Sequence, residues 1–134
     1  MASARALRRV VRLGGVVATA AGLHTMAAGA GSVPGRRAVP DRALDSELRF
    51  YGTYYAAFGL ALVRLAPRAH LDSGALRAAA ATVWLAGAAR AGGWRRHGPP
   101  TAAQQALLAI ELIAPPVVAG WQARLLRSGA TTIP

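Results

Sequence analysis

The chain has 134 residues, which is room for one domain, and 54% of them are apolar while 16% are charged. This composition, with a mean hydropathy of +0.31, excludes a disordered chain and is too apolar for an ordinary soluble domain. The sequence contains no cysteine, which excludes disulfides, a thiol nucleophile and a cysteine-based zinc site.

The formal net charge is +11, and all the basic residues other than histidine are arginines, since the sequence contains no lysine. A charge of this sign is also typical of proteins that bind nucleic acids. Here, however, the arginines form short clusters between apolar runs, a distribution that anionic lipid headgroups and membrane topology favour. The clusters are Arg8-Arg9-Arg12, Arg36-Arg37, Arg95-Arg96 and Arg124-Arg127. We therefore expect membrane lipids as partners and no nucleic acid.

Four apolar stretches follow one another along the chain, at about residues 13–31, 50–66, 75–91 and 102–123. Each has about 17–22 residues, close to the ~20 that an α-helix needs to cross a hydrocarbon core of ~30 Å. Turn-forming residues separate the stretches: Ser32-Val33-Pro34-Gly35 and Pro40-Asp41, then Pro67 to Ser73, then Gly98-Pro99-Pro100. Because such short loops make neighbouring helices antiparallel, the sequence predicts an all-α, up-down-up-down four-helix bundle in the membrane, with residues 1–134 forming a single domain.

The arginines also predict which helix ends face the cytoplasm, because cytoplasmic loops carry an excess of basic residues. Nine arginines fall on one side of the predicted bundle: Arg5, Arg8, Arg9, Arg12, Arg64, Arg68, Arg77, Arg124 and Arg127. Seven fall on the other side: Arg36, Arg37, Arg42, Arg49, Arg90, Arg95 and Arg96. We expect a multi-pass protein of the cell membrane with both termini in the cytoplasm.

A cleavable signal peptide is an alternative interpretation of the N-terminus. An arginine-rich start, an apolar run and the small residues Ala27-Ala28-Gly29-Ala30 are typical of such a peptide. The apolar run is long, however, contains His24, and is followed by three further apolar stretches rather than by a soluble domain. These features favour a first helix that is retained.

Ionisable residues are the informative ones in a membrane, since a charge at the centre of a span costs at least ~2.5–3.5 kcal/mol and normally faces a partner inside the bundle. Five such residues lie within or beside the predicted spans: His24, Glu47, Arg49, Arg90 and Glu111. The alternating topology places the first four of them, together with Gln104, in one half of the membrane, with Glu111 below them.

The second span begins with an acid that is followed by aromatic residues at helical spacing. Glu47, Tyr51, Tyr54 or Tyr55, and Phe58 fall on one face of a helix, and Phe50 lies beside them. An interfacial aromatic belt is one interpretation, but a belt explains one or two rings at the boundary and not three turns of them. We expect these rings to line a substrate pocket, to which Trp84 of the third span adds a deeper ring.

Glu111 lies ~15 Å into the fourth helix, at 1.5 Å per residue, and therefore close to the middle of the membrane. Gln104 shares its face, and Pro115-Pro116 follow one turn later, where they remove backbone donors and predict a kink. Two roles are open for Glu111. It locks the bundle by pairing with an arginine or with a freed carbonyl, or it is kept neutral by desolvation and donates a proton.

We expect no metal and no cofactor. His24, His70 and His97 fall on different elements, and the sequence has no phosphate-binding loop, nucleophile elbow or dinucleotide fingerprint.

Several of these residues carry a resemblance to a known family. Glu47-x-Arg49-Phe50-Tyr51-Gly52, His24 in the first span, and Arg90…Gly98-Pro99…Glu111-Leu112 resemble a widespread family of small bacterial four-span membrane proteins of unknown function. The resemblance covers about residues 14–124. It implies the four-helix architecture and no particular activity.

In length, span number and scattered membrane acids the chain is also similar to the small membrane-bound terpene cyclases of actinomycetes, which act in drimentine- and xiamycin-type indole–terpenoid pathways of secondary metabolism. That resemblance implies an isomerase that starts the cyclisation of a farnesyl chain on an indole-type head by protonation. The substrate would be an apolar polyprenyl-type molecule that enters from the bilayer. Glu47 or Glu111 would donate the proton, Arg49, Arg90 or His24 would tune the donor, and aromatic faces would stabilise the cation.

Two further functions stay open. The chain could be a non-catalytic membrane subunit, or a lipid- or quinone-binding module, in which the polar layer holds the helices together. It could also be a subunit of a small multidrug-type transporter, for which the size and the membrane glutamate are suited. The oligomeric state is open in each case.

Overall fold

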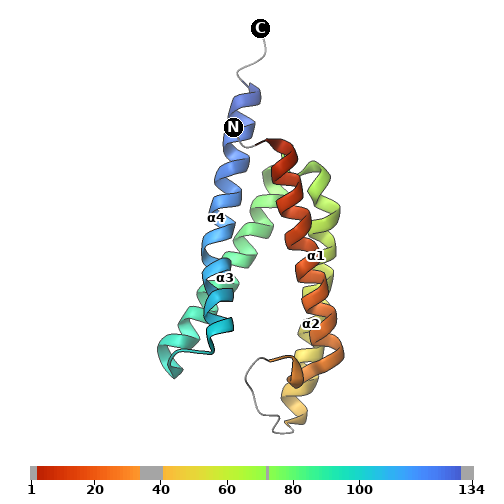
Figure 1. Ribbon diagram of the computed structural model, residues 1–134, viewed down its shortest axis with the longest axis vertical. Coiled ribbons are helices and arrows are strands. Elements are labelled where there is room, and N and C mark those ends of the chain that lie inside the picture. Colours follow the sequence, from red (N-terminus) through yellow and green to blue (C-terminus); the bar gives the residue numbers. More distant parts are fainter. Residues whose placement is uncertain (1–2, 34–40, 72, 131–134) are drawn as a thin grey trace. The chain divides into compact units, whose positions relative to one another are not determined.

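The computed structural model describes residues 3–33, 41–71 and 73–130, and most of these residues are helical. The helices are α1 (Ala4–Ala28), α2 (Arg42–Leu65), α3 (Ser73–His97) and α4 (Ala102–Ala130), with two short 3₁₀ helices, η1 (Gly29–Ser32) and η2 (Ala66–Arg68) (Figure 1). There is no strand in the described ranges, which confirms the all-α prediction. The predicted turn at Pro34-Gly35 and Pro40, and the cluster Arg36-Arg37, lie outside the described residues.

All four helices are longer than the apolar stretches that predicted them. α2 begins eight residues before the predicted span, at Arg42, and α3 extends to His97. Charged and alanine-rich flanks continue a helix without interruption because arginine and alanine both have high helix propensity. The apolar stretches therefore locate the helices correctly and underestimate their lengths.

The chain divides into two compact units, residues 9–66 and residues 1–8 with 67–134. We call the pair α1–α2 within the one unit the first hairpin, and the pair α3–α4 within the other the second hairpin.

The first hairpin is held by glycines that repeat every two turns on both helices. A Cβ atom on Gly15 would lie 2.7 Å from the carbonyl oxygen of Gly59, and one on Gly52 would lie 2.6 Å from the backbone nitrogen of Met26. A Cβ on Gly22 would run into the backbone of Ala56. Because these positions have no side chain, the two antiparallel backbones lie in direct contact, as they do in tightly packed membrane helix pairs.

In the second hairpin, Gly87 makes such a close approach among the described glycines, and side chains make the polar contacts. A Cβ on Gly87 of α3 would lie 2.9 Å from the Cβ of Glu111 in α4. Near the opposite end of the hairpin, the side-chain amide of the fully buried Gln122 donates a hydrogen bond of 2.5 Å to the carbonyl of Ala69. At the far end of α3, Gly98 adopts φ +86° and its N–H donates to the carbonyl of Trp94, so that the helix stops before Pro99-Pro100.

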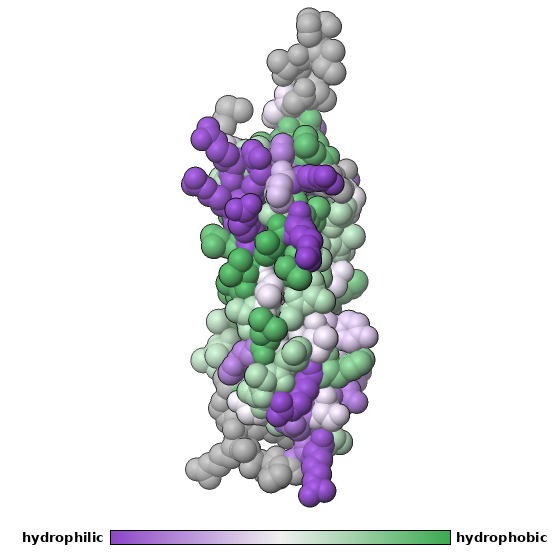
Figure 2. Space-filling model, turned by 90° about the vertical axis from the view of Figure 1, so that its right-hand side faces the viewer, coloured by the Kyte–Doolittle hydropathy of each residue, from purple (hydrophilic) through white to green (hydrophobic). Residues whose placement is uncertain are grey.

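The exterior is rich in large apolar side chains, which appear green in Figure 2. Two segments, 4–32 and 102–128, are long and apolar enough to cross a membrane. In each of them 22% of the most apolar window is buried, whereas the core helix of a soluble protein is mostly buried. Among the described residues, α2 and α3 do not reach the same hydropathy, so the structure supports two of the four predicted spans.

Candidate functional site

The strongest polar contact of the second hairpin joins Arg90 of α3 to Glu111 of α4. Arg90 Nε donates to Glu111 Oε2 at 2.9 Å, and its Nη2 donates to Oε1 at 3.1 Å. This is the two-pronged geometry that gives an arginine–carboxylate pair both strength and direction. The side chain of Glu111 is 8% exposed and that of Arg90 is 39% exposed. Of the two roles that the sequence left open for Glu111, the structure shows the pairing with an arginine.

Gly87 makes this pairing possible. It lies one turn before Arg90, and the absence of a side chain there lets α4 approach α3 at the level of Glu111. The Arg90 side chain then extends from α3 to the Glu111 carboxylate on α4. The ion pair and the close approach therefore form one contact, which fixes the register of α3 against α4.

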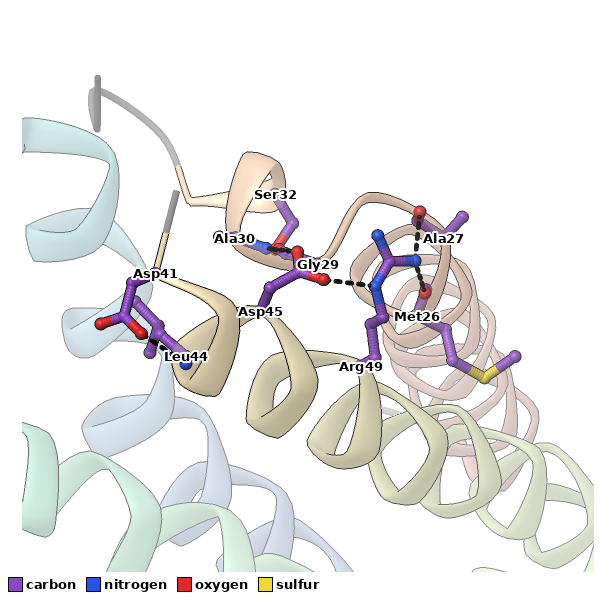
Figure 3. A network of polar contacts seen from close by, with 9 residues as sticks. All are labelled: Met26, Ala27, Gly29, Ala30, Ser32, Asp41, Leu44, Asp45 and Arg49. Atoms are coloured by element: carbon purple, nitrogen blue, oxygen red, sulfur yellow. Dashed lines mark hydrogen bonds and ion pairs between the residues drawn. The ribbon is translucent and has the colours of Figure 1, made fainter. Parts of the chain in front are cut away.

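Arg49 has a different partner set, in the first hairpin (Figure 3). Its Nε donates to Asp45 Oδ2 at 2.7 Å, and its Nη1 donates to the carbonyl oxygens of Met26 and Ala27 at 3.0 and 2.8 Å. These carbonyls belong to the last turn of α1, where backbone acceptors have no partner within the helix. A cation at this end also complements the helix dipole. Arg49 therefore caps α1.

Asp45 completes the same network from α2. Its Oδ1 accepts a hydrogen bond of 2.9 Å from the backbone N–H of Ala30, just after Gly29 turns the chain with φ +52°. A Cβ on Gly29 would overlap the Asp45 carboxylate, so the turn and the carboxylate fit only with glycine. The hydrogen bond from Arg49, followed by that from Ala30, holds the pKa of the Asp45 carboxyl below its usual value. We call Asp45, Arg49 and the end of α1 the helix clasp.

The aromatic residues expected to line a pocket are largely on the surface. Phe50 packs edge-to-face against Tyr51 and Tyr54, with ring centroids 5.8 and 4.9 Å apart. These three rings are 55–61% exposed, and Tyr55 and Trp84 are also exposed, while Phe58 is half-buried. Glu47 is exposed one turn before Tyr51. Within the described residues, the acid and the rings thus form an outward-facing cluster on the first turns of α2.

The remaining predicted site residues are His24 and Gln104, which lie on different helices. His24 is exposed on α1. Gln104 takes part in the start of α4: its Oε1 accepts from the N–H of Thr101 at 3.2 Å, while Thr101 Oγ1 accepts from the N–H of Gln104 at 3.4 Å. This reciprocal pair is a capping box. The structure thus brings together Arg90 with Glu111, and Phe50 with Tyr51 and Tyr54, and it gives Arg49 and Gln104 roles at helix ends.

An apolar groove runs along the second hairpin and begins about one turn from the Arg90–Glu111 pair. Its volume is about 430 Å³. The lining residues are Arg77, Ala80, Ala81, Trp84 and Leu85 from α3, and Pro115, Pro116 and Ala119 from α4. Trp84 is thus the one ring of the predicted substrate pocket that borders this cavity.

Four features of these contacts were missed from the sequence, although signals for most were present. Gly15 and Gly22 in one helix, and Gly52 and Gly59 in the next, are spaced by seven, which indicates a close helix contact. Thr101-x-x-Gln104 has the spacing of a capping box. Asp45 and Arg49 are four apart, the spacing of a helical ion pair. No sequence signal links Gln122 to Ala69, because a lone glutamine does not indicate its partner.

Among the described residues, no group of three histidine, aspartate or glutamate side chains is close enough to hold a metal ion. The described residues do provide an ion pair, a capped helix end, an exposed acid beside aromatic rings, and an apolar groove.

The fold and these contacts define an all-helical protein of two antiparallel hairpins, two of whose helices can cross a membrane. A family described as Domain of unknown function (DUF4345) matches residues 6–122, and the chain belongs to this family. No curated protein and no solved structure matches the chain. The expected membership of a family of unknown function is confirmed, whereas nothing in these comparisons supports the resemblance to terpene cyclases.

Proposed function

We propose that the protein is a multi-pass membrane module that binds an apolar molecule from the bilayer and uses its polar residues to hold its helices together. One observation carries this proposal: polar side chains make contacts between helices, while large apolar side chains face outward. Glu111 and Gln122 are buried and bonded, whereas Val17, Leu85 and Ile113 are 61–67% exposed. Lipid is the solvent that suits such an exterior.

The packing within each hairpin supports the extension from two spans to four. α1 meets α2 backbone to backbone at Gly15, Gly22 and Gly52, so a membrane-crossing α1 carries α2 across with it. In the same way, a membrane-crossing α4 would bring α3 across the membrane with it. The charge of Arg90 within α3 is neutralised by its pairing with Glu111. Packing along α2 also favours an α1 that is retained over a signal peptide. The excess of arginines favours cytoplasmic termini, which a reporter fused after Pro134 tests directly.

The absence of cysteine from the sequence allows a clean test of this placement. Single cysteines replace one exposed apolar residue on each helix: Val17, Leu60, Ala86 and Ile113. Proteoliposomes are then freeze-thawed with a membrane-impermeant maleimide, so that the reagent reaches both aqueous sides. Arg9→Cys and Arg96→Cys, at exposed helix ends, are the controls.

We expect the two controls to react and the four other cysteines to react after detergent is added. Rapid labelling of the cysteine at Leu60 or Ala86 without detergent would place α2 or α3 outside the bilayer and would contradict the four-span proposal.

A proton-initiated terpene cyclase is the second candidate, favoured by Glu47 next to the edge-to-face cluster of Phe50, Tyr51 and Tyr54. Since Glu111 is bonded to Arg90 through both oxygens, Glu47 is the better proton donor. Membranes that contain the Glu47→Gln variant should then fail to cyclise a farnesylated indole that wild-type membranes convert. Conversion at the wild-type rate would eliminate Glu47 from this role.

A further inference from the structure

The groove of the second hairpin exists because small side chains face each other between two fixed contacts. At one end Gly87 and the Arg90–Glu111 pair hold α3 to α4, and at the other Gln122 holds α4 to the turn at Ala69. Between them, the facing residues Ala80, Ala81 and Ala119 are too short to fill the space. Small residues and prolines therefore leave a gap of about 430 Å³, within the range of about 300–1,000 Å³ typical of small-molecule sites.

The lining of the groove is asymmetric in polarity. Trp84, Leu85, Pro115 and Pro116 make its wall apolar, and Arg77 is the charged residue that borders it. Arg77 lies in the second turn of α3, near the end of the helix, whereas Trp84 is seven residues deeper, about 10 Å along the axis. A molecule in the groove therefore meets a cation near the helix end and an apolar surface toward the middle.

Arg77 also differs from the two arginines that hold the fold. Arg49 is paired with Asp45 and Arg90 with Glu111, but in the described part of the chain no carboxylate pairs with Arg77. Its guanidinium, exposed at the rim of the groove, has hydrogen-bond donors in a planar fork that suits a phosphate group.

We propose that this groove binds one acyl chain of an anionic phospholipid, with the lipid phosphate at Arg77 and the chain along Trp84 and the two prolines. The inference rests on the proposed membrane placement, because the chain enters from the bilayer. A neutral isoprenoid would fill the apolar wall equally well but would gain nothing from the cation, so the arginine selects for an anionic head.

Trp84 is itself the reporter for a test. In a Trp94→Phe, Trp121→Phe background it is the sole tryptophan, and neither replaced indole makes a hydrogen bond among the described contacts. The protein is reconstituted in bilayers that contain brominated phosphatidylglycerol or brominated phosphatidylcholine, which quench fluorescence on contact. We expect phosphatidylglycerol to associate with the Trp84 site about fivefold more strongly, the preference that one interfacial arginine provides.

Matched variants isolate the groove. Arg77→Gln should abolish the preference for phosphatidylglycerol, so that the two lipids associate about equally. Ala81→Leu, which fills the groove, should do the same. The controls are Arg96→Gln and Ala78→Leu, exposed α3 positions outside the groove, and they should keep the preference. Soluble glycerol 3-phosphate should leave the quenching unchanged, because it has no acyl chain.

The outcomes separate this inference from the function on which it rests. Equal quenching by the two lipids, or a preference unaffected by Arg77→Gln and Ala81→Leu, would overturn the lipid site while leaving the helices in the bilayer. Reversal by glycerol 3-phosphate would also overturn it, in favour of a simple phosphate site. Absence of quenching by either lipid would overturn both proposals.

Discussion

The two hairpins bring their helices together by different means. In the first, glycines on both helices put backbone against backbone at several levels, and Arg49 of the clasp makes the charged contact from α2 to the end of α1. In the second, Gly87 provides one close approach, and the bidentate ion pair and a glutamine provide the rest.

This difference decides where a ligand can be bound. Glycines bring the backbones of α1 and α2 into direct contact, whereas the second hairpin has a groove between its fixed points. Arg90 and Glu111, two of the candidate catalytic residues in the sequence, form the fixed contact at one end of this groove. The proposed ligand site therefore lies in the second hairpin.

The largest effect is expected from a methyl group placed in the first hairpin. Gly15→Ala puts a Cβ atom 2.7–2.9 Å from Gly59 and Val63, so the helices must separate, at a cost of about 2–3 kcal/mol in the free energy of unfolding. Gly14→Ala is the matched control, because its Cβ meets nothing within 4 Å and alanine favours the helix by up to about 1 kcal/mol. Unfolding in bicelles measures both. Equal effects of the two substitutions would remove the distinction between the hairpins.

In the second hairpin, the corresponding test removes a side chain. Gln122→Ala leaves the carbonyl of Ala69 without its donor in a buried position, which should cost about 1–2 kcal/mol in the same unfolding measurement. Gln105→Ala, which loses a hydrogen bond to Pro100 at a more exposed site, serves as the control and should cost less. If the order were reversed, side-chain contact at this end would not hold the hairpin.

A smaller effect is expected at the clasp. Arg49→Gln removes the cation that caps α1 and is bonded to Met26 and Ala27, and since Arg49 is half exposed the loss should be about 0.5–1 kcal/mol. Hydrogen exchange of the last turn of α1 should accelerate while that of α4 stays unchanged. Acceleration throughout the molecule would show that the clasp supports more than this helix end.

The smallest effect is a dependence on pH. The pKa of Asp45 is lower in the folded protein, so its ionised form stabilises the fold above the unfolded value of about 3.9, and this contribution is lost as the pH falls through the lower folded value. Wild-type stability should therefore decline from about pH 4 downward, and Asp45→Asn should show a flatter profile there. Identical acid profiles would argue that the clasp carboxylate is not held in its charged form.

Much of the fold could be predicted because apolar runs and proline–glycine breaks are local signals. The four runs located α1 to α4, and the glycine before Pro99 indicated the end of α3. The helix ends were underestimated because hydropathy, and not helix propensity, set the predicted limits. The cost of a mid-helix acid also predicted that Glu111 needs a partner.

The partners themselves were harder to predict. Arg49 was expected beside a catalytic acid, but its bonds to α1 depend on how the chain turns at Gly29, which the sequence does not specify. The groove was missed because α3 is rich in small residues and the middle of α4 has large apolar residues on most sides, so neither helix shows which face meets the other. The aromatic residues of α2 were evident in the sequence. Their exposure follows from the glycines of α2, which occupy the face that packs against α1.

The coupling between Arg90 and Glu111 is the most direct measure of whether polar residues hold the second hairpin together. A double-mutant cycle with Arg90→Gln, Glu111→Gln and the double variant, followed by unfolding in bicelles, gives the interaction free energy of the pair. The bidentate geometry and the burial of Glu111 predict a favourable coupling of about 1–2 kcal/mol. Additive effects of the two substitutions, with a coupling below about 0.5 kcal/mol, would contradict the structural role of the pair.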